Sequence, residues 1–300
     1  MSKAFSKTCC WIVAIAAVLT VFSITAYAQN APNASNGRDG NRVGNFVAQL
    51  QGPARTEFNI PPKTEGEHPL MPALRWADSG LKQVEQNVQD YSAYLIKQER
   101  INGKLAPQQT LFVKVRHKPF SAYTKFVKPD NLAGQEALYV DGANNGKMWA
   151  HTVGIRNTIV GTVSLKPTSS FAMEGQRYPI TELGVQNLVR RLLEVGMEDA
   201  KYGECDVKFL DNAKINDRTC LCIQVLHPVP RKNFRFHLAR IYVDKELNLP
   251  IRYEAYDWPR QKGGQPELLE AYTYLNLKIN NGFTDNDFDP RNPNFQFDVK

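Results

Sequence analysis

Three cysteines and two histidines in the second half of the chain are of the residue types that bind metal ions. Cys220 and Cys222 are separated by one residue, Cys205 precedes them, and His227 and His237 follow. Zinc sites built from Cys and His use characteristic short spacings that this set lacks. We therefore expect no metal ion to be bound by these residues.

Two further segments match ligand-binding loops only in part. Gly142–Lys147 has three residues between its glycines, where a phosphate-binding loop has four, and Met148 stands where Ser or Thr would bind magnesium. The acidic run Asp285–Asp289 looks like the start of a calcium loop, but Pro290 occupies the position that requires Gly. We predict an ordinary turn at the first segment and a helix-starting turn at the second.

Motifs of catalysis are missing from the sequence. It contains neither the Gly-x-Ser-x-Gly turn of hydrolases nor the His-Glu-x-x-His helix of zinc proteases. Glu254 and Asp257 are of the types used in acid–base catalysis, although the same residues are typical of a solvated surface. We assign no catalytic residue and no cofactor, and expect a protein that is not an enzyme. An uncharacterised exported enzyme is kept as an alternative.

The segment His227–His237 is the densest basic and aromatic stretch of the chain. Arg231 and Arg235 within it, and Arg240 just after it, are candidates for binding an anionic group. The planar guanidinium of arginine makes two-pronged contacts with carboxylates and phosphates. The alternative is a loop that leads into a strand whose alternate side chains are solvated.

Two amphipathic helices are predicted among the elements that position these residues. Apolar residues from Leu74 to Val88 recur at helical spacing, which predicts a helix over about 72–88. A second set follows the same pattern from Val185 to Gly196. Thr181 is predicted to be the N-cap of this second helix, with Glu182 in its first turn.

Short strand-like runs make up most of the remaining chain, and each is bounded by Pro, Gly, Asn or Asp. Their short connections favour antiparallel neighbours, so we predict an α+β fold with about ten or eleven antiparallel strands. Several runs are apolar on both faces, which indicates a curved sheet wrapped around helices or a cavity, or simply a two-sided core. The predicted strands are 91–101, 111–117, 121–128, 136–141, 147–153, 158–165, 205–213, 218–226, 234–243, 250–257 and 267–279.

Two pairs of strands are joined by tight-turn signals, Asn102-Gly103 and Asn216-Asp217. Uninterrupted pairing from the first turn places Tyr94 opposite Leu111, with both on one face. Uninterrupted pairing from the second places Phe209 on the same face as Cys220 and Cys222.

The first 28 residues have the features of a secretory signal peptide. Lys3 and Lys7 precede the apolar run Trp11–Thr25, and Ala26-Tyr27-Ala28 supplies a cleavage pattern. The cysteines of this segment precede the apolar run, so we expect a soluble exported protein and not a lipoprotein. Cleavage would remove two lysines, lowering the formal net charge from +7 to +5, and would leave three cysteines. Because exported thiols tend to oxidise, we expect one disulfide and a buried cysteine, with the pairing left open.

Residues 29–68 are rich in Asn, Gly, Pro, Gln and Arg and have no helical or strand period. Such a segment cannot bury enough apolar surface to offset the entropy lost on ordering, so we predict a flexible arm. Residues 69–300 then form a single α+β domain, within the usual size range.

From about Leu74 to Phe297 the chain resembles a family of exported bacterial proteins of unknown function. The matching runs are 227–244, 247–259, 270–278 and 284–288. That family is similar in fold to the LolA/LolB lipoprotein carriers. The resemblance implies an open half-barrel, in which a curved antiparallel sheet has helices on its concave side and shelters acyl chains there.

This resemblance implies a periplasmic or envelope protein that binds or carries a lipidic or lipoprotein ligand. We expect a lipid, a lipoprotein acyl chain or another cell-envelope component as partner, and no nucleic acid. The alternative is an envelope-interaction protein that binds an anionic polymer or lipid through the basic aromatic stretch. Candidate residues lining the hydrophobic cavity are Tyr94, Phe112, Trp149, Leu188, Leu192, Tyr242 and Tyr253.

Overall fold

The computed structural model describes residues 58–154, 161–261 and 263–299. The predicted signal peptide and most of the predicted arm lie outside these residues. Within the described part of the arm, the ring of Phe58 packs edge-on against Trp76 at a centroid distance of 5.3 Å.

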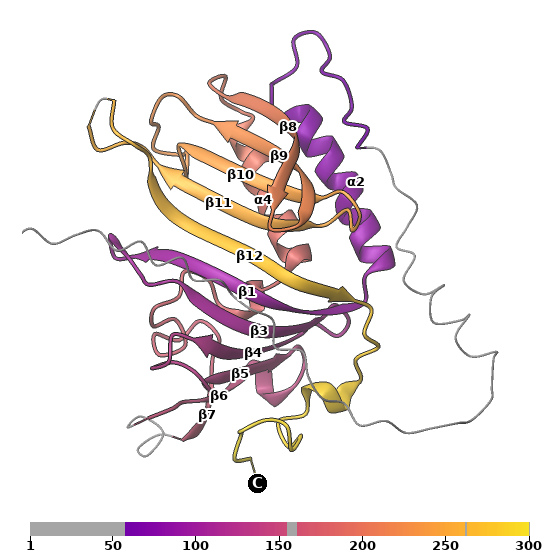
Figure 1. The fold of residues 1–300 in the computed structure, drawn as a ribbon, viewed down its shortest axis with the longest axis vertical. Coiled ribbons are helices and arrows are strands. Elements are labelled where there is room, and N and C mark those ends of the chain that lie inside the picture. The colour runs from indigo at the N-terminus through magenta and orange to yellow at the C-terminus, as the bar shows by residue number, and fades with distance from the viewer. Residues whose placement is uncertain (1–57, 155–160, 262, 300) are drawn as a thin grey trace, which may run out of the picture. The chain divides into compact units, whose positions relative to one another are not determined.

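Twelve strands form one sheet in which all neighbouring strands run antiparallel (Figure 1). The order across the sheet is β7-β6-β5-β4-β3-β1-β12-β11-β10-β9-β8, and β2 pairs only with β1. The strands are β1 (Asp90–Ile101), β2 (Lys104–Leu105), β3 (Gln109–Arg116), β4 (Ser121–Lys128), β5 (Glu136–Val140), β6 (Met148–His151), β7 (Thr162–Leu165), β8 (Asp206–Ile215), β9 (Arg218–Leu226), β10 (Leu238–Asp244), β11 (Pro250–Asp257) and β12 (Glu267–Ile279).

The sheet consists of two meanders, each built from strands that follow one another in sequence. They are joined in the middle by β1 and β12, where Tyr91 pairs with Ile279 and Glu99 with Glu270. The outermost strands, β7 and β8, do not pair with each other, so the sheet stays open. The predicted α+β class and open antiparallel sheet are confirmed, with one or two more strands than expected.

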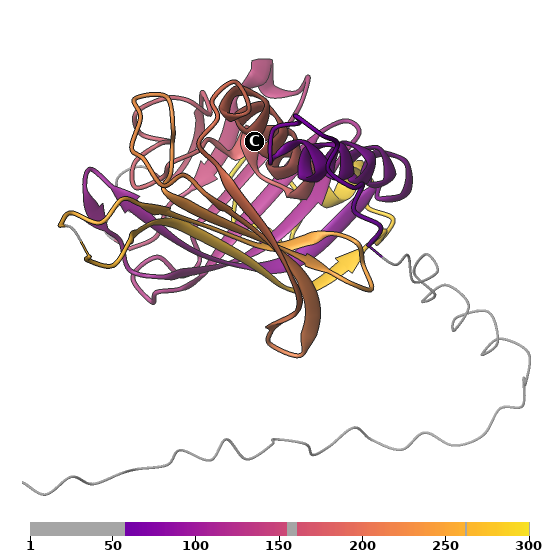
Figure 2. The same ribbon diagram turned by 90° about the horizontal axis from the view of Figure 1, so that it is seen from above.

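Two α-helices, α2 (Met71–Asn87) and α4 (Val185–Asp199), lie on the same side of the curved sheet, its concave side (Figure 2). The predicted N-cap of α4 is wrong. Thr181 belongs to a short 3-10 turn, η3 (Ile180–Glu182), and α4 starts only at Val185. The reason is Gly184, whose φ of 120° breaks the helical path between the two elements.

The core lies between these helices and the inner face of the sheet. Around α4, buried residues of the second meander such as Ile223 and Ala239 belong to one core cluster with Leu74 of α2. Around β1 and β3, buried residues such as Val113 belong to a second core cluster with Val84 of α2. One continuous helix therefore packs against both meanders.

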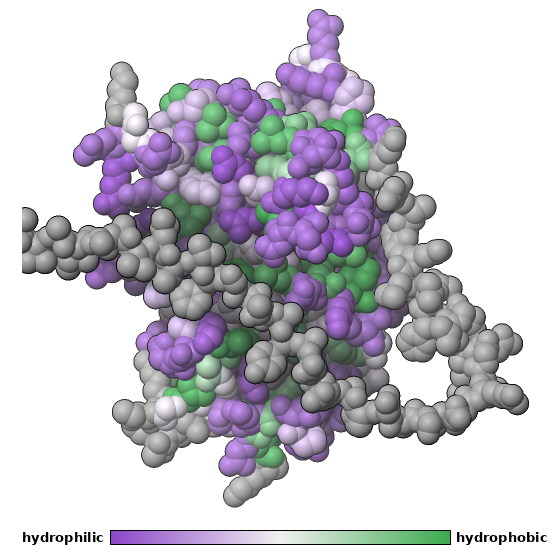
Figure 3. Space-filling view, in the orientation of Figure 1, coloured by the Kyte–Doolittle hydropathy of each residue, from purple (hydrophilic) through white to green (hydrophobic). Residues whose placement is uncertain are grey.

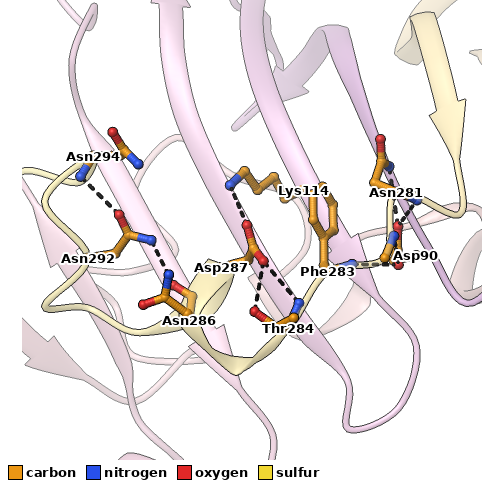
Figure 4. A network of polar contacts seen from close by, with 10 residues as sticks. Asp90, Lys114, Asn281, Phe283, Thr284, Asn286, Asp287, Asn292 and Asn294 are labelled. Carbon is orange, nitrogen blue, oxygen red and sulfur yellow. Dashed lines mark hydrogen bonds and ion pairs between the residues drawn. The ribbon is translucent and has the colours of Figure 1, made fainter. Parts of the chain in front are cut away.

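The outer face of β3–β6 is covered by the segment that follows β12 (Figure 4). Its anchor is Asp90, 2% exposed, whose carboxylate accepts backbone N–H bonds from Asn281, Gly282 and Phe283 at 2.6, 3.1 and 3.0 Å. Further along, the predicted helix-starting turn is confirmed as η4 (Asp285–Phe288), which has a capping box at Thr284.

Both hairpin turns are confirmed, but both predicted registers beyond them are wrong. In the first, Ile101 pairs with Lys104 as expected, yet Tyr94 lies opposite Phe112 and not opposite Leu111. The extra residue falls between β2 and β3. A slip of one residue turns the side chains of a strand to the other face of the sheet.

The second hairpin contains an equivalent bulge. Ile215 pairs with Arg218 next to the turn, but the register shifts between Leu210 and Ala213. Phe209 consequently lies opposite Ile223 and packs in the inner core. Asn212, within the shift, has a φ of 59°, which asparagine adopts more readily than most residues.

The expected disulfide is not formed, because Cys205, Cys220 and Cys222 are all free and buried. Cys205 packs in the inner core cluster, whereas Cys222 contacts Tyr242 on the outer face. The sheet therefore separates them. The segment at Gly142–Lys147 is a turn, as predicted, with the 3-10 element η2 (Asn144–Gly146).

Candidate functional site

A cavity of about 1360 Å³ lies on the inner face of the sheet, beneath α4 and the chain segment 171–184. Both meanders contribute to its floor, since Leu95 and Leu111 come from one and Tyr253 from the other. Leu188 and Leu192 of α4 line it from the opposite side. Apolar atoms make up the larger part of its lining surface, although many polar and charged side chains also line it, so it can accommodate a large apolar ligand.

Three of the seven residues proposed from the sequence line this cavity: Leu188, Leu192 and Tyr253. The structure places the other four on the outer face, because alternate residues of a strand point to opposite faces. Phe112 and Trp149 pack beneath the C-terminal segment, and Tyr94 is 40% exposed and contacts Phe112. Tyr242 lies beside Glu254, outside the cavity.

The surface outside the cavity is mixed. Figure 3 shows hydrophilic and apolar side chains side by side in the upper part of the view, where β8–β10 lie, and further apolar side chains across its middle. Glu254 is buried on the outer face between Arg240 and Arg252, at 3.2 and 2.6 Å. Its ion pairs, and the exposure of Asp257, do not fit a catalytic carboxylate pair.

The three arginines proposed for an anionic group have different surroundings. Arg235 is exposed and lines the cavity. Arg231 is paired with Glu204, with Nε 2.6 Å from the carboxylate, and Arg240 belongs to the outer face. The structure thus brings only Arg235 to the cavity.

A buried polar cluster, which was not foreseen from the sequence, lies on the cavity floor. Lys97 Nζ is 3.0 Å from Glu99 Oε2 and also donates to Gln176. The Tyr272 hydroxyl lies between the carboxylates of Glu99 and Glu270: it donates its proton to Glu99 at 2.5 Å, and its oxygen is 3.3 Å from Glu270.

The other half of this cluster ties the segment 171–184 to the sheet. Arg177 Nε lies 2.8 Å from Glu270, and the Tyr178 hydroxyl donates to the same carboxylate at 3.1 Å. Each of the four charged side chains of the cluster thus has a partner of opposite charge. The cluster forms a charge-balanced wall of the cavity.

Burial dominates the electrostatics of this cluster. It lowers the pKa of Lys97, against the opposing attraction of Glu99. It raises the pKa of Glu270, against Arg177 and Tyr178, and raises the pKa of Tyr178 to about 12. The tyrosine hydroxyls therefore stay protonated and act as hydrogen-bond donors at neutral pH.

A sequence signal for the cluster does exist. Tyr91, Ala93 and Leu95 alternate along β1 and all face inward, and Lys97 and Glu99 continue the same alternation. Charges that are in phase with a buried apolar face predict a buried ion pair. The signal was missed because the slipped register assigned the inward face to Tyr94.

A second buried polar pair closes the end of α4. His227 is fully buried, and its Nε2 lies 3.5 Å from the carboxylate of Asp199. Burial lowers the pKa of His227 and raises the pKa of Asp199 to about 6. The His227 ring stacks on Phe234 at 4.0 Å, which fixes the beginning of the segment 227–237.

Among the residues described, no three His, Cys, Asp or Glu side chains come together as a metal site. In the same part of the chain, no helix combines the length and the apolar composition needed to cross a membrane.

Comparison with known proteins gives one family and several distant structures. Residues 88–297 match a family described as "protein of unknown function (DUF1571)". No curated protein sequence matches significantly. The predicted membership of a family of unknown function is confirmed.

Three of the matching solved structures illustrate the structural likeness. An uncharacterised conserved protein of Thermus thermophilus is 12% identical, with 71% of this chain and 91% of that chain covered and a TM-score of 0.40. The lipoprotein LppX of Mycobacterium tuberculosis is 12% identical, with coverages of 70% and 98% and a TM-score of 0.39. A LolA superfamily protein of Nitrosomonas europaea is 10% identical, with coverages of 71% and 97% and a TM-score of 0.28.

Proposed function

Since the chain belongs to the DUF1571 family, whose function is unknown, we propose from the cavity itself that the protein binds and carries a lipidic ligand without chemically changing it. The supporting observation is the cavity of about 1360 Å³ with a largely apolar lining. Pockets for ordinary small ligands measure about 300–1,000 Å³, so this one suits a longer apolar molecule. An acyl chain would gain about 0.8 kcal/mol for each methylene group that it buries there.

The polar cluster supports binding more than catalysis. A general acid or base needs a group that can exchange a proton with the ligand. Lys97 and Glu99 are instead paired with each other, as are Arg177 and Glu270. A cluster whose charges are paired can be covered by an apolar chain without leaving an uncompensated charge.

The proposal includes work in the cell envelope. Residues 1–28 have the charge, apolar run and cleavage pattern of a signal peptide. An acyl chain of a lipid or lipoprotein is the ligand chemistry that such a compartment offers to an apolar cavity.

Binding is tested with a fluorescent fatty acid and the purified protein, together with native mass spectrometry of untreated and delipidated samples. We expect the fatty acid to bind and the untreated protein to show the added mass of lipid. Leu188→Gln and Leu192→Gln each place a polar amide group in the lining. The bound fatty acid would cover this amide without pairing its hydrogen bonds, so each variant is expected to bind about tenfold more weakly.

Met197→Gln is the matched control, because Met197 lies on the same helix but is 52% exposed. It should bind like the unchanged protein. Absence of fatty-acid binding together with equal masses of the two samples would refute the proposal, and so would equal binding by all four proteins.

A further inference from the structure

The loop between β9 and β10 is not explained by the cavity alone. Its residues from Pro228 to Lys232 are all exposed, and Val229, an aliphatic residue, is 47% exposed. The loop is nevertheless firmly held, since Phe234 stacks on His227 and contacts Tyr202 at a centroid distance of 5.8 Å. Its aromatic residues therefore face the protein, while Val229 and Lys232 face the solvent.

This loop keeps a positive charge. Of its three basic residues, only Arg231 forms an ion pair, with Glu204. Within the described residues, Lys232 and Arg235 have neither an ion pair nor a side-chain hydrogen bond, although the charge of Arg235 is felt by the buried Asp199. Two cations thus remain available next to an exposed aliphatic side chain.

The cavity reaches the surface beside this loop. Arg235 is exposed and lines the cavity, and its neighbour Phe236 also lines it from a buried position. On the segment 171–184, Phe171 is a second lining residue that is exposed, at 40%. A ligand that enters beside Arg235 would therefore pass directly from whatever surface the loop contacts.

We propose that the loop 228–235 docks the protein onto an anionic lipid surface, with the entrance of the cavity facing the bilayer. Lys232 and Arg235 would contact lipid phosphates, for which the arginine fork is well suited, and Val229 would enter the headgroup region. Each basic residue near an anionic membrane adds a favourable electrostatic contribution to the free energy of binding, and salt screens this contribution. This docking goes beyond the proposed function, because it assigns a surface and a partner that lie outside the cavity.

The test measures co-sedimentation of the purified protein with vesicles of phosphatidylcholine, with and without phosphatidylglycerol. We expect association only with the phosphatidylglycerol vesicles, and its loss at high salt. The double variant Val229→Asp/Lys232→Glu changes two loop residues that do not line the cavity, and should bind these vesicles at least about tenfold more weakly.

The control is Lys104→Glu/Leu105→Asp on β2, which changes one exposed lysine and one exposed aliphatic residue in the same way. It should associate with vesicles like the unchanged protein. An equal loss of vesicle association in both double variants would overturn the proposal. So would a failure of the unchanged protein to associate with the vesicles at low salt. So would retention of a soluble anionic polysaccharide with no vesicle association.

A parallel measurement separates this proposal from the proposed function. The loop variant should bind the fluorescent fatty acid in solution with unchanged affinity while transferring it more slowly from anionic vesicles. Binding of the fatty acid without vesicle association would refute the docking proposal but not the carrier proposal. Vesicle association without lipid binding refutes only the carrier.

Discussion

The hydroxyl oxygen of Tyr91, on the central strand β1, accepts a hydrogen bond from the backbone N–H of Val185, the first residue of α4, at 2.9 Å. The first N–H groups of a helix have no partner within the helix, and a side chain just before it usually supplies one. Gly184 has no side chain, so Tyr91 takes over this role from across the core. The bond fixes the start of the helix that covers the cavity.

Removing this hydroxyl should destabilise the protein. Tyr91 is 1% exposed, so Tyr91→Phe leaves the N–H of Val185 buried without its partner. We expect a loss of about 1–3 kcal/mol in the free energy of unfolding, measured by urea denaturation. Tyr139→Phe, which removes a hydroxyl bonded to Asp141 at an exposed site, should cause little change. A loss that is equally small in both variants would contradict the role of Tyr91.

Glycine at position 184 is required twice over. Its φ is 120°, and an added Cβ would lie 2.9 Å from the Tyr91 hydroxyl. Gly184→Ala should therefore cost about 1–3 kcal/mol for the backbone alone, in addition to the clash. In the double variant with Tyr91→Phe the clash disappears but the backbone cost remains. The double variant should therefore lose less stability than the sum of the losses in the two single variants.

Gly80 provides the contrast in the same denaturation experiment. It lies inside α2, and an added Cβ would meet no atom within 4 Å. Gly80→Ala should stabilise the protein by about 0.5–1 kcal/mol, because alanine loses less backbone entropy in a helix. If Gly80→Ala destabilised the protein, intrinsic helix propensity would not determine the stability of α2 at this position.

The ion pair on the cavity floor should show strong coupling. Lys97→Met leaves Glu99 buried without its cation and should cost about 3–5 kcal/mol. The double variant Lys97→Met/Glu99→Leu removes both charges and should be more stable than Lys97→Met. Lys82→Met breaks an exposed pair with Asp78 and serves as the control, with almost unchanged stability expected. Additive losses in the double variant would exclude the pairing.

The stability of the protein should depend on the ionisation of Asp199. Burial raises the pKa of this carboxyl to about 6, from 3.8, so the folded state favours its protonated form. Relative to the ionised carboxyl, protonated Asp199 stabilises the folded state. This stabilisation is fully present below pH 3.8 and is lost as the pH rises through about 6. Since Asp199 is 2% exposed, the loss amounts to about 3 kcal/mol at neutral pH.

Asp199→Asn removes this dependence, and thermal or urea unfolding from pH 4 to pH 8 measures it. The variant should be more stable than the unchanged protein above pH 6 and similar to it near pH 4. Burial lowers the pKa of His227, so protonation of this ring destabilises the folded state of both proteins as the pH falls. Glu194→Gln, at an exposed carboxylate on the same helix that does not contribute to the Asp199 shift, should leave the pH profile unchanged.

Much of the fold follows from the sequence, because the turn and strand signals are local. The Asn102-Gly103 and Asn216-Asp217 turns and the boundaries of strands such as β9 and β12 agree with the prediction. Local signals do not predict the bulge in β8. The register shift beside Asn212 is this bulge, and a bulge depends on how two whole strands pair and twist, not on the residues of the turn.

The site was predicted less well for the same reason. Leu188, Leu192 and Tyr253 line the cavity, but Tyr94 faces outward after the one-residue slip before β3. The slipped register also hid the inward-facing Lys97 and Glu99, and the remaining partners of the polar cluster are distant in sequence. Glu99 and Glu270 become neighbours only through the pairing of β1 with β12.

That central pairing has a consequence for the order of events in folding. Every other pair along the sheet joins strands that are close in sequence, so each meander can form by local hairpin steps. Bringing β1 to β12 instead closes a loop of most of the domain, which makes it the slow step. Because Leu95 and Tyr253 stand on opposite sides of this seam, the cavity does not exist until the two meanders meet. A ligand of the cavity can therefore stabilise the finished protein and slow its unfolding, but it cannot speed the assembly of either half.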